Sequence, residues 1–118
     1  ARALATDYDI VVVAAALGSK ALLDDALTLH PVRGQVTIGR RVPPSAPRHP
    51  VNGNGHFIPR GDLWLCGATY GRADASTEVR AADHAANLER LRALLPAVAG
   101  DLEADFASGA VQAWTGVR

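Results

Sequence analysis

Two arginines that lie near glycines are the first candidates for binding a ligand. Arg118 follows Trp114 and Gly116 in the last residues, and an arginine delivered by the end of a strand is well shaped for bidentate binding of a carboxylate. Arg33 precedes Gly34, which puts a cation beside a position where a ligand can approach the backbone. Taken alone, Arg118 is only a chain end, and Arg33 with Gly34 is equally a surface arginine beside a bulge glycine.

A histidine supplies the next candidate. His56 follows a Gly-Asn-Gly turn at the start of an expected strand, where an imidazole could act as a general base or contact a substrate. A single histidine more often has no chemical role. No second His, Cys or carboxylate lies at metal-ligand spacing from His56, so we predict no metal site. Cys66 has no neighbouring cation that would stabilise a thiolate, and we interpret it as a core residue.

The third candidate is a stretch of backbone. Residues 13–19 form an apolar run that ends on Ala16 and Gly18, and small residues at the carboxyl end of a strand let a flat or phosphorylated ligand come close. The segment has no three-glycine dinucleotide fingerprint. On its own it is more simply a buried strand followed by an ordinary turn.

Several elements are expected to position these residues. Residues 8–16 form a continuous run rich in β-branched residues, which predicts a parallel strand buried on both faces; a short helix candidate follows at 19–27. Residues 35–38 alternate polar and apolar side chains, as a half-buried strand does, and a proline-rich loop comes next. Residues 56–59 and 63–69 predict a hairpin that turns at Gly61.

The second half of the chain is expected to be mainly helical. Residues 76–98 carry leucines at spacings of three and four, which predicts one long helix capped by Asp74 or Ser76, or starting later at Asp83. Pro96 should bring this helix close to its end. Residues 101–106 are ambiguous, and residues 110–114 predict a last strand that leads to Arg118.

The composition bounds the class of protein. The chain has 118 residues, 48% of them apolar, and a formal net charge of zero, which suits one domain with a modest core. The balanced charge argues against a nonspecific nucleic-acid surface. One cysteine makes no internal disulfide framework, and the longest apolar run, residues 10–17, is far shorter than a membrane-spanning helix. We expect a soluble, untargeted cytoplasmic protein. Since the chain lacks an initiator Met and stops within an element, we expect it to be part of a longer protein.

Six segments together resemble the FAD-dependent oxidoreductases of the D-amino-acid oxidase and glycine oxidase type. Within that family they are most similar to the C-terminal module of bifunctional tRNA-modifying enzymes. The resemblance extends over residues 8–118, and the order and spacing of the segments carry it. The segments are residues 9–18, 30–36, 55–59, 66–70, 87–91 and 114–118.

The resemblance implies an α+β substrate-binding domain at residues 30–113, in which a long helix packs on an antiparallel mixed sheet. Residues 1–29 would end an FAD-binding domain, contributing one of its strands and a connection, and residues 114–118 would return to it. FAD is the implied cofactor of the intact protein, with Ala16, Gly18 and Gly34 beside it. Arg118, His56 and Arg33 are the implied substrate-binding residues: Arg118 matches the arginine that holds the substrate carboxylate, and His56 stands where related oxidases have a substrate-contacting tyrosine.

The implied reaction is flavin-mediated oxidation of a secondary amine. It removes the carboxymethyl group from carboxymethylaminomethyluridine at the tRNA wobble position and leaves aminomethyluridine, so tRNA, the rest of the FAD-binding domain and a fused methyltransferase are the implied partners. The chain has no glycine-rich phosphate-binding turn, and we expect it alone to bind FAD weakly and to be inactive.

Two other functions remain open from the sequence. One is a glycine or sarcosine oxidase that acts on free amino acids, and the other is a non-catalytic α+β binding or assembly domain. A basic face that binds RNA is a further possibility, in which the carboxylates of Asp62 and Asp74 would reduce the positive charge. The face would consist of Arg40, Arg41, Arg48, Arg60 and Arg72.

Overall fold

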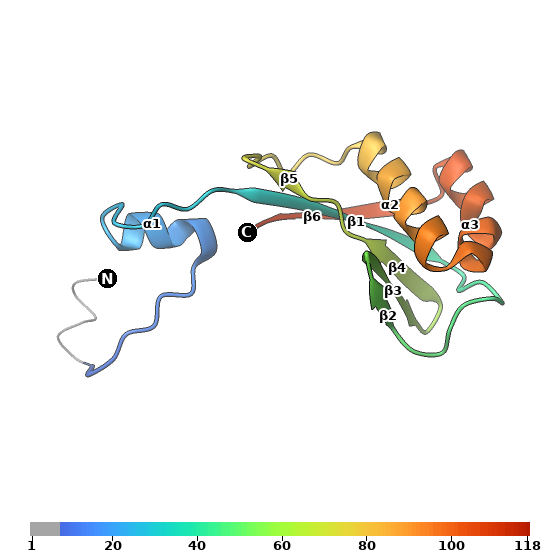
Figure 1. The fold of residues 1–118 in the computed structure, drawn as a ribbon, viewed down its shortest axis with the longest axis horizontal. Helices are drawn as coiled ribbons and strands as arrows, with labels where there is room; N and C mark the ends of the chain where they lie inside the picture. The colour runs from blue at the N-terminus through green and yellow to red at the C-terminus, as the bar shows by residue number, and fades with distance from the viewer. Residues whose placement is uncertain (1–7) are drawn as a thin grey trace.

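The structure, a computed structural model, describes residues 8–118. One antiparallel sheet carries two long helices on the same face, and an N-terminal arm extends from it (Figure 1). The strands are β1 (Val32–Arg40), β2 (Val51–Gly53), β3 (Gly55–Arg60), β4 (Leu63–Gly67), β5 (Gly71–Arg72) and β6 (Gln112–Val117). The helices are the 3₁₀ helix η2 (Ala16–Gly18), α1 (Ser19–Leu22), α2 (Ala81–Leu94) and α3 (Pro96–Ser108). The predicted α+β class with an antiparallel sheet is confirmed.

Strand β1 is the centre of the sheet. Its residue Val36 pairs with Gly67 of β4 on one edge and with Trp114 of β6 on the other. Arg33 pairs with Gly71 of β5, so β4 and β5 follow one another along one edge of β1 while β6 occupies the opposite edge. Strand β6 pairs with β1 from Gln112 to Val117 without a break, and the domain boundary at Trp114 stays a prediction.

The predicted hairpin is confirmed as strands β3 and β4. Ile58 pairs with Leu65, and the turn between the strands contains Gly61 at a φ of 61°. A positive φ costs glycine little because it has no Cβ. This local turn chemistry explains why the hairpin was predictable.

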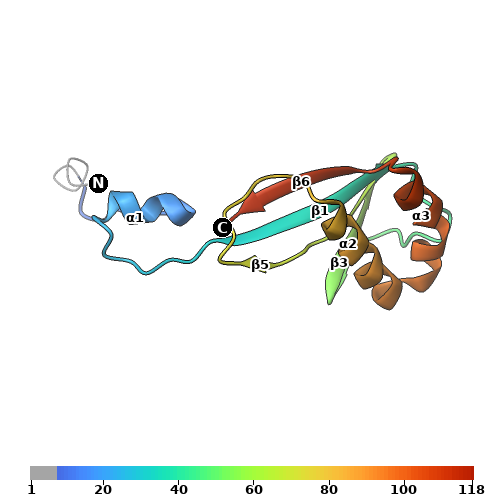
Figure 2. The same cartoon turned by 90° about the horizontal axis from the view of Figure 1, so that it is seen from above.

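Strand β1 buries its polar side chains and leaves its apolar side chains partly exposed, which is the reverse of the usual pattern. The polar residues Arg33, Gln35 and Thr37 are buried against the helices, whereas Val36 and Ile38 are only half-buried on the other face. Alternate side chains of a strand point to opposite faces. Once one residue of the strand faces the helices, the face of every other residue is therefore fixed. Because α2 and α3 lie on one side of the sheet (Figure 1 and Figure 2), the apolar side chains of β1 face away from them.

The hydrophobic core lies between the sheet and the two helices. The indole of Trp64 is 1% exposed and stacks between Phe57 and Phe106, at centroid distances of 6.3 and 5.8 Å. A Cβ built on Gly39 would stand 2.2 Å from that indole, so glycine is required where Trp64 crosses β1. The other core residues are Cys66, Leu88, Leu91, Val98, Ala99 and Leu102, which confirms the interpretation of Cys66.

The helical region differs from the prediction at its start and its end. Helix α2 begins at Ala81, because the Gln35 side chain binds the backbone N–H and C=O of Arg80 and holds that residue extended. Pro96 ends α2 as expected, yet it also occupies the first turn of α3, where its missing N–H costs nothing. None of the helices in residues 8–118 is long and apolar enough to cross a bilayer.

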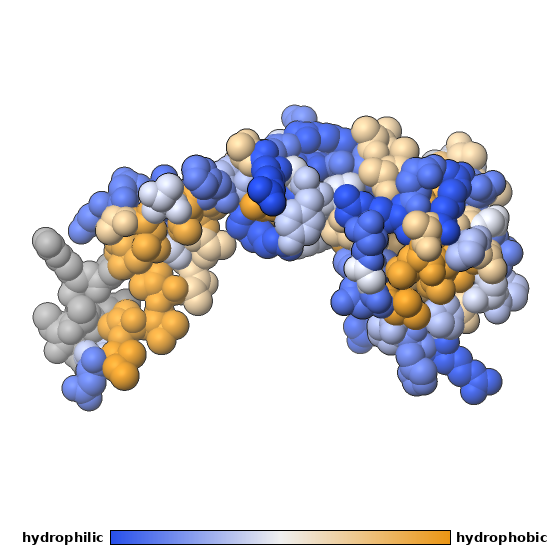
Figure 3. Space-filling model, viewed as in Figure 1, coloured by the Kyte–Doolittle hydropathy of each residue, from blue (hydrophilic) through white to orange (hydrophobic). Residues whose placement is uncertain are grey.

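The predicted strand at residues 8–16 is wrong for this structure. Residues 8–15 adopt no regular structure, and η2 and α1 follow them in an arm that extends away from the sheet (Figure 1). A strand requires the N–H and C=O groups of a neighbouring strand, and no strand lies beside this segment in the described part of the chain. Its apolar side chains are exposed instead, as the orange group on the arm in Figure 3 shows; Ile10 and Val12 are 81% and 82% exposed.

Candidate functional site

The face of the sheet opposite α2 and α3 carries the candidate site, and we call it the open face. Residues paired directly across antiparallel strands point to the same side, so the strand register defines its members. They are Val32, Gly34, Val36 and Ile38 of β1, His56 and Ile58 of β3, Leu65 and Gly67 of β4, and Trp114 and Gly116 of β6. Arg118 joins them because it exchanges backbone hydrogen bonds with Val32 at 2.8 and 3.1 Å.

The middle of the open face is a shallow apolar hollow, which we call the glycine hollow. Its volume is about 340 Å³, and glycines form its floor where Gly34 pairs with Gly116. A Cβ on Gly116 would stand 2.5 Å from the ring of Trp114, so the absence of a side chain lets the indole lie along the sheet. The indole thus covers Gly116, and its exposed ring together with Gly34 offers a flat apolar surface that fits one face of a flavin.

A second hollow adjoins the first, and we call it the polar hollow. It has a volume of about 380 Å³ and shares His56, Ala68 and Arg118 with the glycine hollow. Tyr70, Arg90 and the Gly-Asn-Gly turn between β2 and β3 complete its lining. A flat apolar surface thus continues into a region of hydrogen-bond donors.

The cations of the polar hollow are held in place. The guanidinium carbon of Arg118 lies 4.4 Å from the centroid of the Tyr70 ring, an attractive cation–π contact. The Nη1 of Arg90 donates a hydrogen bond to the carbonyl oxygen of Ala68 at 2.6 Å. Burial lowers the pKa of His56 below 6.5, so its imidazole is neutral near pH 7 and can accept a proton.

Three of the predicted site residues come together in these hollows. His56 and Arg118 line both, and Gly34 lies in the floor of the glycine hollow. Ala16 and Gly18 belong to η2 in the arm, and neither lines either hollow. The structure therefore does not bring Ala16 and Gly18 close to Gly34, the third residue predicted to lie beside FAD.

The placement of Arg33 corrects its predicted role in substrate binding. Its side chain lies on the helix side of β1 with 2% exposure and forms an ion pair with Asp83. The other Nη donates to the Gln35 side chain at 3.0 Å and to the carbonyl of Glu78. Because β1 alternates, Gly34 faces the open side and Arg33 must face the helices. The sequence could not show which of the two would face the ligand.

A polar network surrounds Arg33. The Gln35 side chain binds both the N–H and the C=O of Arg80, at 2.9 Å each. The Asn87 amide donates to the Gln35 carbonyl at 3.0 Å, and Thr37 shares a hydrogen bond of 2.8 Å with His84. Buried polar groups are stable when they are paired in this way, so the network fixes α2 and the segment before it on β1.

Sequence reasoning missed the contribution of Arg90 and understated that of Trp114. Arg90 lies on α2 between core positions, and only the tertiary contact with Ala68 brings it to the polar hollow. Trp114 was considered only as a neighbour of Arg118, yet it is 63% exposed on the open face. With Val36 and Val117 it forms part of the apolar lining of the glycine hollow.

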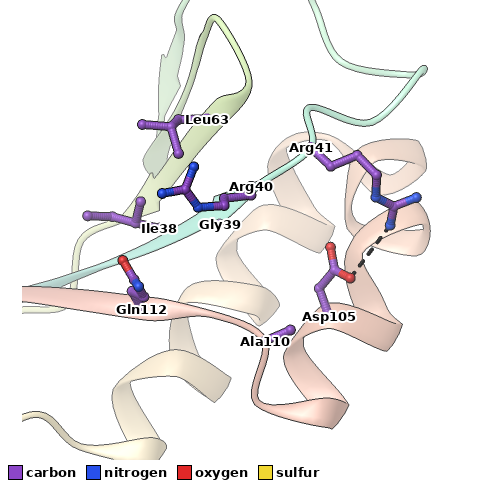
Figure 4. Close-up of a pocket in the computed structure, with 8 residues that line it drawn as sticks. All are labelled: Ile38, Gly39, Arg40, Arg41, Leu63, Asp105, Ala110 and Gln112. Carbon is purple, nitrogen blue, oxygen red and sulfur yellow. Dashed lines mark ion pairs between the residues drawn. The ribbon is translucent and has the colours of Figure 1, made fainter.

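The basic-face alternative is weakened by ion pairs. Arg40 pairs with Asp62 at 3.3 Å, and Arg41 pairs with Asp105 at 3.6 Å. Figure 4 shows the second pair at the mouth of a separate hollow at the far end of β1. Of the five arginines in that alternative, two are thus compensated. Among residues 8–118, no three His, Cys, Asp or Glu side chains gather to hold a metal ion.

Comparisons with known proteins identify relatives of the chain. The family model described as DAO, FAD dependent oxidoreductase, matches residues 2–118. Over 93% of its length the chain is 39% identical to the tRNA 5-methylaminomethyl-2-thiouridine biosynthesis bifunctional protein MnmC of Polaromonas naphthalenivorans, and over 92% it is 40% identical to MnmC of Verminephrobacter eiseniae. It covers 20% and 22% of these proteins, about a fifth of their length.

A solved structure has a similar fold. Glycine oxidase from Bacillus cereus superposes with a TM-score of 0.54 at 24% sequence identity, over 75% of this chain and 23% of that one. The likeness confirms the predicted α+β fold with helices on an antiparallel sheet.

Proposed function

The chain belongs to the DAO family of FAD-dependent oxidoreductases, and on this premise we propose that it forms the substrate-facing wall of an amine-oxidising site. The observation that carries this proposal is the position of Arg118. Its guanidinium lies over Tyr70 at the edge of the flat apolar floor of the glycine hollow. A carboxylate bound by Arg118 would therefore sit beside a flavin packed on that floor.

The substrate that we propose is the carboxymethylaminomethyl group of a tRNA wobble uridine. The support comes from the relatives named for tRNA 5-methylaminomethyl-2-thiouridine biosynthesis. The open rim of the polar hollow, formed by the exposed residues Asn52 and Asn54, leaves room for a substrate much larger than an amino acid. The chain would act as one part of a longer protein that also contains the flavin-binding turn.

Each residue of the hollows has a proposed task. Arg118 binds the carboxylate through two parallel N–H···O bonds, which fixes the carbon between nitrogen and carboxylate. Neutral His56 takes the proton that the substrate ammonium must lose before that carbon can be oxidised. FAD, when bound, would supply the two-electron oxidation of this carbon to the imine level. Water then hydrolyses the resulting imine to an aminomethyl group and glyoxylate. Holding the reacting groups in register can contribute roughly 7–11 kcal/mol to the barrier reduction.

Two experiments test the proposal. The FAD-loaded protein that carries this chain is offered an anticodon stem-loop RNA containing carboxymethylaminomethyluridine, and in parallel glycine and sarcosine. We expect release of glyoxylate and an aminomethyluridine product from the RNA; oxidation of the amino acids alone would favour the free amino-acid alternative. The 118-residue chain is also titrated with FAD, and submicromolar affinity would contradict the expectation that the chain alone binds FAD weakly.

A further inference from the structure

The polar hollow contains a second fixed arginine besides Arg118. Arg90 reaches the hollow from α2, and its Cβ and Cδ would lie 3.5 and 3.9 Å from a Cβ built on Gly55. Its Nη1 is held by the carbonyl oxygen of Ala68 at 2.6 Å. The stem is packed and one nitrogen is bound, so the guanidinium is held in one position with further N–H groups available to a ligand.

The two arginines of this hollow are uncompensated within residues 8–118. The arginines with ion pairs in the structure are Arg33, Arg40, Arg41, Arg80 and Arg92. Neither Arg90 nor Arg118 has one, and Arg90 is half-buried. Removing a cation from water without a counter-charge is unfavourable. The polar hollow thus offers one half-buried and one exposed guanidinium that can each bind an anion, whereas a substrate carboxylate supplies only one.

The second anion follows from the proposed substrate, and this inference rests on that proposed function. A nucleotide within RNA has a phosphate on each side, whereas a free amino acid or nucleoside has none. We propose that Arg90, together with the Asn52–Asn54 turn, binds a backbone phosphate of the RNA next to the nucleotide whose carboxylate Arg118 holds. Arginine forks, asparagine amides and backbone N–H groups are common phosphate ligands.

The alternative role of Arg90 is structural, as a donor that only satisfies the Ala68 carbonyl. The two roles differ in salt dependence, because a phosphate contact releases counterions and a structural hydrogen bond does not. They also differ in substrate dependence. A phosphate contact favours RNA over the free nucleoside, whereas structural damage affects both substrates alike.

The test uses the FAD-loaded protein with Arg90→Gln, Arg90→Lys and the control Arg92→Gln. Arg92 lies on the same helix, is exposed and pairs with Glu103 at 2.8 Å, outside the polar hollow. The dissociation constant of the substrate stem-loop RNA is measured by fluorescence anisotropy over a range of KCl concentrations. Values of kcat/KM are measured with the same RNA and with the carboxymethylaminomethyluridine nucleoside.

For Arg90→Gln we expect the slope of log K against log salt to lose about 0.7, and the preference in kcat/KM for RNA over nucleoside to fall about tenfold. Arg90→Lys should keep the slope, and Arg92→Gln should match the unaltered protein in both measures. As a second approach, a methylphosphonate beside the modified nucleotide should reduce the slope in the unaltered protein. That measurement uses the unaltered protein alone, so it is independent of how the variants fold.

Two results would overturn the phosphate site. If the unaltered protein oxidises the RNA while Arg90→Gln keeps the full salt slope and the full RNA preference, the phosphate site is wrong and the proposed function stands. If the unaltered protein oxidises neither the RNA nor the nucleoside, the proposed function fails and the phosphate site fails with it.

Discussion

Replacing Asp83 with alanine tests whether Arg33 has a structural or a substrate-binding role. The Arg33 side chain is 2% exposed and that of Asp83 is 18% exposed. Asp83→Ala leaves a guanidinium buried without its counter-charge, which typically costs about 3–5 kcal/mol. Arg33→Met removes the buried cation and leaves a carboxylate that water reaches more easily, so we expect a smaller cost of about 1–3 kcal/mol.

The assay is urea unfolding followed by tryptophan fluorescence, since Trp64 is 1% exposed and loses its core environment on unfolding. With an m value of about 1–3 kcal/mol/M, Asp83→Ala should lower the midpoint by about 1 M or more. The double variant should unfold at higher urea than Asp83→Ala alone, which requires a coupling larger than the cost of Arg33→Met, that is, about 3 kcal/mol. Strictly additive single effects, or an Arg33→Met protein of normal stability that no longer binds substrate, would refute this account of Arg33.

Three further predictions concern the core and its titrating groups. Gly39→Ala should lower the free energy of unfolding by about 1–3 kcal/mol, because its Cβ would displace the ring of Trp64, which lies 2.2 Å from that position; an unchanged urea midpoint would contradict this. Burial raises the pKa of Cys66 to about 12, so we expect the thiol to resist alkylation at pH 8 until urea unfolds the protein, and rapid labelling of the native protein would count against it. Burial lowers the pKa of His84 below 6.5, partly opposed by Asp83; the unfolded chain then binds more protons, and stability should fall as the pH drops below about 6.5. His84→Gln should flatten this decline in urea midpoints measured from pH 7.5 to 5.5, and an equally steep decline in the variant would show that the protonation of His84 is not its cause.

Local chemistry made part of the fold predictable. The hairpin depends on Gly61 and its turn, and the end of α2 depends on Pro96, so both could be found from neighbouring residues. The start of α2 could not, because Gln35, far away in the chain, binds the backbone of Arg80 and holds the preceding segment extended. The strand predicted at residues 8–16 failed because strand formation depends on a partner, which no run of apolar residues provides.

The site residues also differ in whether neighbouring residues in the sequence could reveal them. Arg118, His56 and Gly34 were found from residue type and nearby glycines, and the structure places them in adjoining hollows. The sequence could not place Arg33 correctly. The alternating pattern shows that Arg33 and Gly34 point to opposite faces of the strand, but it does not show which face the helices cover. Arg90 depends on a contact between α2 and the end of β4, and such contacts are set by packing alone.

The most direct test of the central claim is the carboxylate selectivity of Arg118. With the FAD-loaded protein, kcat/KM is compared for carboxymethylaminomethyluridine RNA and for the same RNA bearing an alkylamine of equal length without the carboxylate. Arg118→Gln should lower kcat/KM for the carboxylate substrate roughly 10- to 100-fold and remove most of the preference over the neutral analogue. An undiminished preference for the carboxylate in Arg118→Gln would contradict the claim that this side chain anchors the substrate.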